Sequence, residues 1–102
     1  MKGKIFDRQG RILAVVEVKG SPELYIGQIE KLTPDPAIKA LFNDYRESVN
    51  GQLFVEVDRL DREIEELEPE MVADSGEKFR IWDLQIYPEE MSVSFRPLIH
   101  SE

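Results

Sequence analysis

Apolar residues recur every three or four positions through the middle of the chain, in two consecutive blocks that follow Asp35-Pro36. The first block is Ile38, Leu41, Phe42, Tyr45 and Val49, and the second is Leu53, Val57, Leu60, Ile64 and Leu67. This spacing is typical of helices that bury one face, and Asp35 and Pro36 suit a helix cap and a first helical position. The pattern therefore predicts helical structure over residues 36–68.

Two alternatives remain open within this region. Asn50-Gly51 is compatible with a tight connection between two helices, but the apolar spacing continues through it, so one long bent helix is equally consistent. Residues 53–57 also alternate as a strand would, although the helical spacing explains a longer stretch and is favoured. Pro69 restricts Glu68 away from helical geometry and ends the element.

Segments rich in β-branched and aromatic residues flank the helical region on both sides. Three strands are predicted before it, over residues 4–6, 12–18 and 24–32, separated by turn-forming clusters at 7–10 and 19–22. After an irregular stretch at 70–77, a second hairpin is predicted over 79–87 and 91–95. Trp82, Leu84 and Ile86 share one face of its first strand, opposite Ile81 and Tyr87, so both faces carry apolar groups.

The resulting order is β-β-β-α-α-β-β, with helices grouped rather than alternating with strands. It predicts an α+β domain over residues 1–102: a mostly antiparallel sheet of about five strands with the helical pair packed on one face. We expect a helical stripe to be buried against the sheet residues Ile12, Val16 and Val93; this stripe consists of Ile38, Phe42, Tyr45, Val49, Leu60 and Ile64.

The negative charge of the chain is concentrated in one segment. Ten of the 21 acidic residues lie between Glu56 and Glu77, where only Arg59 and Arg62 oppose them, so this segment alone accounts for the net charge of −8. Asp58, Asp61 and Glu65 fall on one side of the second helix, where a cation site is conceivable. A solvated helix face with an ordinary Asp58–Arg62 ion pair is the favoured interpretation, and no metal site is predicted.

Glu65, Glu66 and Glu68 crowd the C-terminal end of that helix. The helix dipole disfavours each carboxylate there by about 0.3 to 1 kcal/mol. Such a cluster indicates either a surface kept for binding or local neutralisation by Lys78 or Arg80, the second being favoured. Trp82 is the other candidate contact, because an exposed aromatic beside charged groups often marks a partner surface.

Several functional classes find no support in the sequence. It contains no cysteine, and His100 is its only histidine, so a catalytic triad or a His-pair metal site has no candidates. No phosphate-binding or nucleotide-binding motif is present, and we predict no enzyme, no catalytic residue and no cofactor. The longest apolar run is far too short to span a membrane, and net negative charge disfavours nucleic acid. We expect a soluble, cytoplasmic protein.

These observations predict a non-enzymatic interaction module that binds a basic protein through its acidic helical face, as an immunity or inhibitor protein would. The candidate partner-binding residues are Asp58, Asp61, Glu65, Glu66, Glu68 and Trp82. One alternative is a structural homo-oligomer, such as a homodimer, joined through exposed sheet aromatics or a free strand edge. Another is a small ligand-binding protein or enzyme with a pocket between the helices and the sheet.

Overall fold

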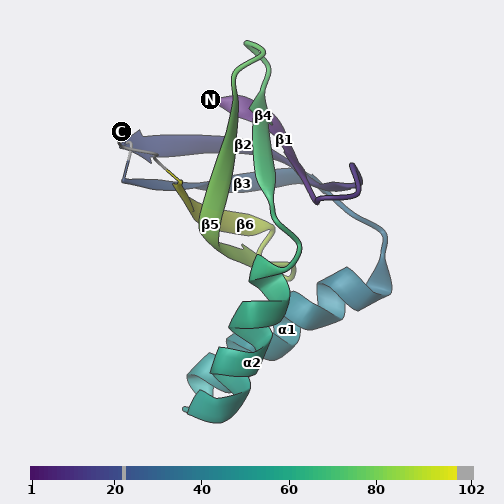
Figure 1. The fold of residues 1–102 in the computed structure, drawn as a ribbon, viewed down its shortest axis with the longest axis vertical. Helices are drawn as coiled ribbons and strands as arrows, with labels where there is room; N and C mark the ends of the chain where they lie inside the picture. The colour runs from purple at the N-terminus through teal and green to yellow at the C-terminus, as the bar shows by residue number, and fades with distance from the viewer. Residues whose placement is uncertain (22, 99–102) are drawn as a thin grey trace.

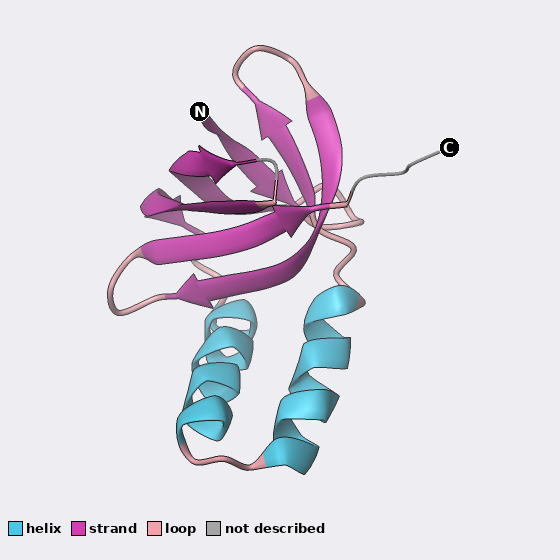
Figure 2. Cartoon of the chain, turned by 90° about the vertical axis from the view of Figure 1, so that its left-hand side faces the viewer, coloured by secondary structure: helices cyan, strands magenta, loops and turns pink. Residues whose placement is uncertain are grey.

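Six antiparallel strands close into a barrel, and two helices project from one end of it (Figures 1 and 2). The computed structural model describes residues 1–21 and 23–98, so Pro22 of the second predicted turn and His100 lie outside the described residues. The elements are β1 (Lys2–Phe6), β2 (Ile12–Ser21), β3 (Leu24–Leu32), α1 (Pro36–Asn50), α2 (Phe54–Glu65), β4 (Glu70–Ala73), β5 (Lys78–Tyr87) and β6 (Ser92–Pro97). The α+β class and the antiparallel pairing are confirmed.

The barrel consists of two three-stranded meanders joined along two seams. The strand order is β1-β2-β3-β6-β5-β4, and the circle closes where β1 pairs with β4. The prediction of about five strands was wrong because β4 lies in the stretch expected to be irregular. This strand has only four residues, of which Met71 and Ala73 are buried. So short a segment carries too few alternations to be recognised in a sequence.

The helical region is a hairpin of two helices, which settles the first open alternative. Asp35 caps α1 by accepting a hydrogen bond from the Ala37 amide at 2.9 Å, as expected. The connection turns at Gln52, whose φ is 57°, and α2 begins at Phe54, so the helix interpretation of this stretch is also confirmed. The hairpin does not lie across one face of a sheet. It extends from the end of the barrel, and its contacts with the strands are mainly with β5 (Figure 2).

The core fills the barrel and continues into the base of the hairpin. Its largest fully buried side chains are Phe42, Phe95, Ile5, Leu13, Met71, Ile86, Val16, Val18 and Val93. Most of the predicted stripe is buried, but Tyr45 is only half-buried and Val49 is 48% exposed, because α1 continues beyond the barrel. Ile12 is 42% exposed, since a register shift against β1 places Leu13 and Ala14 inside instead.

A bulge in β5 corrects the predicted faces of that strand. Ile81, Leu84 and Ile86 are all buried, whereas Trp82 is 47% exposed. The register against β6 shifts between Trp82 and Gln85, and Asp83 has a φ of 52°. The bulge adds one residue to the strand, so the side-chain alternation changes phase there. Leu84 and Ile86 therefore do not share a face with Trp82, and the apolar residues thought to occupy both faces lie mostly inside.

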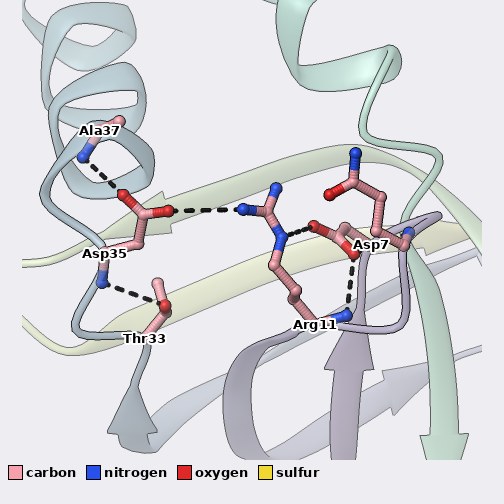
Figure 3. A network of polar contacts seen from close by, with 6 residues as sticks. Asp7, Arg11, Thr33, Asp35 and Ala37 are labelled. Carbon is pink, nitrogen blue, oxygen red and sulfur yellow. Dashed lines mark hydrogen bonds and ion pairs between the residues drawn. The ribbon is translucent and has the colours of Figure 1, made fainter.

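A polar network joins the first turn of the chain to the start of α1 (Figure 3). The buried carboxylate of Asp7 accepts hydrogen bonds from the Gln9 and Arg11 amides, both at 2.9 Å, and from Arg11 Nε at 2.8 Å. Arg11 Nη1 also lies 3.6 Å from Asp35 Oδ2, beside the cap of α1. Burial raises the pKa of Asp7, but these hydrogen bonds outweigh it, so the pKa lies below its ordinary value.

Candidate protein-binding surface

Three of the six predicted contact residues meet in one hollow. It lies between the C-terminal end of α2 and strand β5, has a volume of about 150 Å³, and is called the α2–β5 hollow below. Glu65 and Glu68 line it from the helix end and Trp82 lines it from β5, with Ile64, Pro69 and Leu98 supplying apolar wall. Arg80 and Asp83 also line it, so three carboxylates, one guanidinium, an aromatic ring and apolar side chains share one small concavity.

The bulge in β5 is what presents Trp82 to this hollow. Asp83 takes up a left-handed backbone conformation, which aspartate tolerates better than most residues. Its carboxylate is held by Arg96 Nε at 3.2 Å, and the Arg96 guanidinium lies 5.9 Å from the Trp82 ring centroid. Asp83 and Arg96 were missed in the sequence. The only signal was a single acidic residue interrupting an apolar strand where the alternation fails.

The helix end is only partly neutralised by its surroundings. Arg80 Nη2 lies 3.6 Å from Glu68 Oε1, with both side chains about half exposed. Glu65 and Glu66 have no ion-pair partner among residues 1–21 and 23–98, and Lys78 does not fold back onto them. The backbone dipole leaves partial negative charge at this end of α2, a place that generally disfavours carboxylates.

Asp58 and Asp61 lie nearer the N-terminal end of α2 and do not line the hollow. Asp61 is half-buried; burial raises the pKa of its carboxyl above the ordinary value, and the nearby charges of Asp83 and Asp58 raise it further. Asp58 is exposed, and the expected Asp58–Arg62 ion pair is absent from the described side chains. Another residue forms the helix ion pairs instead: Arg59 lies 2.7 Å from Glu56 and 3.2 Å from Glu63.

Glu66 faces a different part of the molecule. It lines a second hollow of about 210 Å³ beside the first turn of the chain, together with Arg8 and Arg11. The six predicted contact residues therefore do not form one hollow: Glu65, Glu68 and Trp82 come together, Asp58 lies on the same exposed side of α2 as Glu65, Asp61 is half-buried, and Glu66 faces the first turn. Within the described part of the chain, no three acidic or histidine side chains are arranged to hold a metal ion.

The α2–β5 hollow is suited to a single long side chain. Its volume is well below the roughly 300 Å³ at which small-molecule sites begin. A lysine or arginine entering it would place its methylene groups against Trp82 and Leu98 and its charge beside Glu65. Cation–aromatic contact of this kind contributes roughly 0.5 to 1 kcal/mol at exposed sites.

Comparison of the chain with known protein families, curated protein sequences and solved structures gives no significant match. Neither helix of the described chain is long and apolar enough to cross a membrane. The arrangement of the residues is accordingly the basis for any functional assignment.

Proposed function

We propose that this protein is an interaction module that binds a basic protein at the α2–β5 hollow. The observation that carries the proposal is the convergence of Glu65, Glu68 and Trp82 on one small concavity. A partner's lysine or arginine is the side chain that matches this set, because its stem is apolar and its end is cationic. Glu65 is available to such a cation, whereas Glu68 would be shared with Arg80.

The charge distribution supports the same partner. Residues 56–77 hold ten acidic and two basic side chains, and the rest of the chain is balanced. A concentrated negative surface accelerates encounter with a positive one and makes the association rate sensitive to salt. The helix end is only partly neutralised, and the stability that this costs is understandable if these carboxylates are retained for binding.

The proposal is tested by charge reversal on a partner recovered by affinity capture from the cells that make the protein. With that partner purified, Glu65→Lys should slow association and lower affinity at least about 10-fold, and it should reduce the dependence of binding on salt. Glu77→Lys makes the same charge change in the distant β4–β5 turn and is the control. Trp82 is the only tryptophan, so its fluorescence should change on binding. Equal effects of the two reversals would contradict the proposal.

Of the two features that favoured a homo-oligomer, a free strand edge and exposed sheet aromatics, only the exposed aromatic is found. Each of the six described strands pairs with two neighbours, so the free strand edge expected from the sequence is absent there. The exposed ring of Trp82, beside the 39% exposed Leu98, still favours an apolar contact between copies. Measurement of mass in solution decides: a monomer at high micromolar concentration removes this alternative, and a dimer that Trp82→Lys dissociates would replace the main proposal.

A further inference from the structure

The distal end of the helical hairpin exposes a group of large apolar side chains. Val49 is 48% exposed, Leu53 55%, Phe54 72% and Val55 81%, and these four residues are called the hairpin tip below. The hairpin extends away from the barrel (Figure 2), and Leu53, Phe54 and Val55 lie at its turn and at the start of α2, whereas Val49 also borders a hollow with Gln85 and Tyr87 of β5. The sequence assigned Val49 to the buried stripe, which is wrong, and placed Leu53 in the apolar spacing of the second helix, although this side chain is also exposed.

Folding does not account for these side chains. The buried face of α2 is supplied by Leu60 and Ile64, which lie nearer the barrel. At the N-terminal end of α2, Leu53 occupies the cap position and makes no capping hydrogen bond, although serine or aspartate there would stabilise the helix. Phe54 and Val55 follow in the exposed first turn, where polar residues would serve equally well. Several large apolar groups exposed together indicate a contact surface.

The hairpin tip is continuous with the acidic surface. Val55, Asp58, Arg62 and Glu65 are spaced by three, four and three residues and are all exposed, so they form one stripe along the outer side of α2. At 1.5 Å per residue, about 15 Å of helix separates Val55 from Glu65. The tip and the α2–β5 hollow thus lie at the two ends of one helix face.

We propose that the hairpin tip is the apolar anchor of the interface that the α2–β5 hollow forms with a basic protein, an inference that rests on the proposed function. The partner then carries an apolar pocket for Phe54 about 15 Å from the lysine or arginine that enters the hollow. Apolar side chains inserted in a partner's pocket supply much of the affinity of protein interfaces, whereas charged pairs at the rim chiefly set association rate.

Charge and contact area favour a basic protein at the hairpin tip over a second copy of the chain or an anionic lipid surface. Residues 36–68 contain nine acidic and four basic side chains, so two copies meeting through their hairpins would bring like charges together. Four side chains are also far fewer than the roughly 20 to 30 residues per partner of a stable interface. An anionic lipid surface would be repelled by the same carboxylates. A basic protein gains from both the apolar and the acidic parts.

Site-specific photo-crosslinking in the full chain tests the anchor. The photoreactive residue p-benzoylphenylalanine replaces Phe54 in one variant and Ile26 in another, Ile26 being a 57% exposed apolar residue of β3. After irradiation in the native cells, position 54 should capture a basic protein, and position 26 should not. The attachment point should be an apolar residue of the partner, with lysine or arginine about 15 Å away.

Affinity measurements with the partner that wild-type protein captures separate the two proposals. Phe54→Ala should raise Kd about 30-fold or more, as truncation of a central anchor does, and Ile26→Ala should raise it less than about threefold. If Glu65→Lys weakens binding but Phe54→Ala does not, the anchor is wrong and the proposed function stands. If neither weakens binding, both fail. Crosslinking of position 54 to a second copy of the chain, or binding to phosphatidylserine vesicles that Phe54→Ala abolishes, would also overturn the anchor.

Discussion

Apolar side chains are buried in the barrel and exposed in the distal half of the helical hairpin. In the barrel, Phe95, Ile5 and Val16 are completely buried, and every strand is bonded to two others. In the hairpin, the buried apolar residues lie in the half of each helix nearer the barrel, Ile38 and Phe42 in α1 and Leu60 and Ile64 in α2, and Ser48 is the one buried residue further out. The apolar residues Val49, Leu53, Phe54 and Val55 of the distal half are exposed. Stability is therefore concentrated in the barrel and the hairpin base, and the exposed side chains of the distal hairpin contribute little to it.

The largest expected effect comes from a pair of phenylalanines on the two helices. Phe42 is 1% exposed and Phe54 is 72% exposed. Phe42→Ala should lower the free energy of unfolding by about 3 to 5 kcal/mol because it leaves a cavity in the core. Phe54→Ala should change it by less than about 0.5 kcal/mol, as surface substitutions usually do. Urea titration of both variants measures this difference, and similar losses would erase the contrast between the two regions.

The second effect concerns the joint between barrel and hairpin. Asp7→Ala should lower the free energy of unfolding by about 1 to 3 kcal/mol, since the Gln9 and Arg11 amides lose their acceptor. Because the pKa of Asp7 is depressed in the folded chain, its stabilisation is present above about pH 4, the ordinary value, and is lost at lower pH. The difference between variant and wild type should therefore shrink in acid.

Asp74→Ala, in the exposed turn between β4 and β5, is the matched control for this joint. It should leave stability nearly unchanged at every pH. If Asp7→Ala behaves in the same way, the network around Arg11 does not fasten the hairpin to the barrel.

A smaller effect is expected at the helix end, where stability and binding should respond in opposite directions. Reversal of Glu65 and Glu66 to lysine should leave stability unchanged or raise it by roughly 0.3 to 1 kcal/mol per residue, because cations suit a helix C-terminus. Partner binding should weaken. Glu68→Lys should give no such gain, since it loses Arg80. Thermal unfolding gives the stability part, and marked destabilisation by the double reversal would identify these carboxylates as structural.

The smallest effect is expected at Asp61. Burial, then Asp83 and Asp58, raises the pKa of its carboxyl, so ionised Asp61 is less favourable in the folded chain than in the unfolded one. Asp61→Asn should slightly raise the midpoint of thermal unfolding at pH 7. As pH falls through the raised folded pKa, wild-type Asp61 becomes neutral, and the advantage should be gone below about pH 4. A lower midpoint at pH 7 would indicate that the charged form has an unrecognised partner.

The sequence was informative wherever a pattern is local. The strand over 24–32, the cap at Asp35 and the two helices follow from composition and spacing, and the structure confirms them. Closure of the barrel depends on β4, a four-residue strand whose partners are β1 and β5. The pairing of β4 with β1, at the other end of the sequence, cannot be recognised from the spacing of apolar residues. A sheet with helices on one face was therefore expected where a closed barrel occurs.

The candidate site was predictable in part for the same reason. The acidic end of α2 and Trp82 could be named, since a dipole violation and an aromatic in a polar context are local features. Their convergence could not be predicted, because the bulge at Asp83 reverses the alternation of β5. The exposure of Val49 and Leu53 could not be predicted from the sequence either. An apolar stripe shows which face of a helix is apolar, but it does not show how much of the helix is covered by other parts of the protein.

The connectivity of the two meanders determines the order in which the chain can fold. Within β1-β2-β3 and β4-β5-β6 the paired residues are close in sequence, whereas the seams join Lys4 to Val72 and Gly27 to Val93. Contacts of such long sequence separation form slowly, because loop closure must precede them. The helical hairpin lies in the segment between β3 and β4, and each helical turn that forms early shortens the flexible chain that joins the two meanders. We therefore expect early formation of the helices that carry the proposed binding surface to speed closure of the barrel.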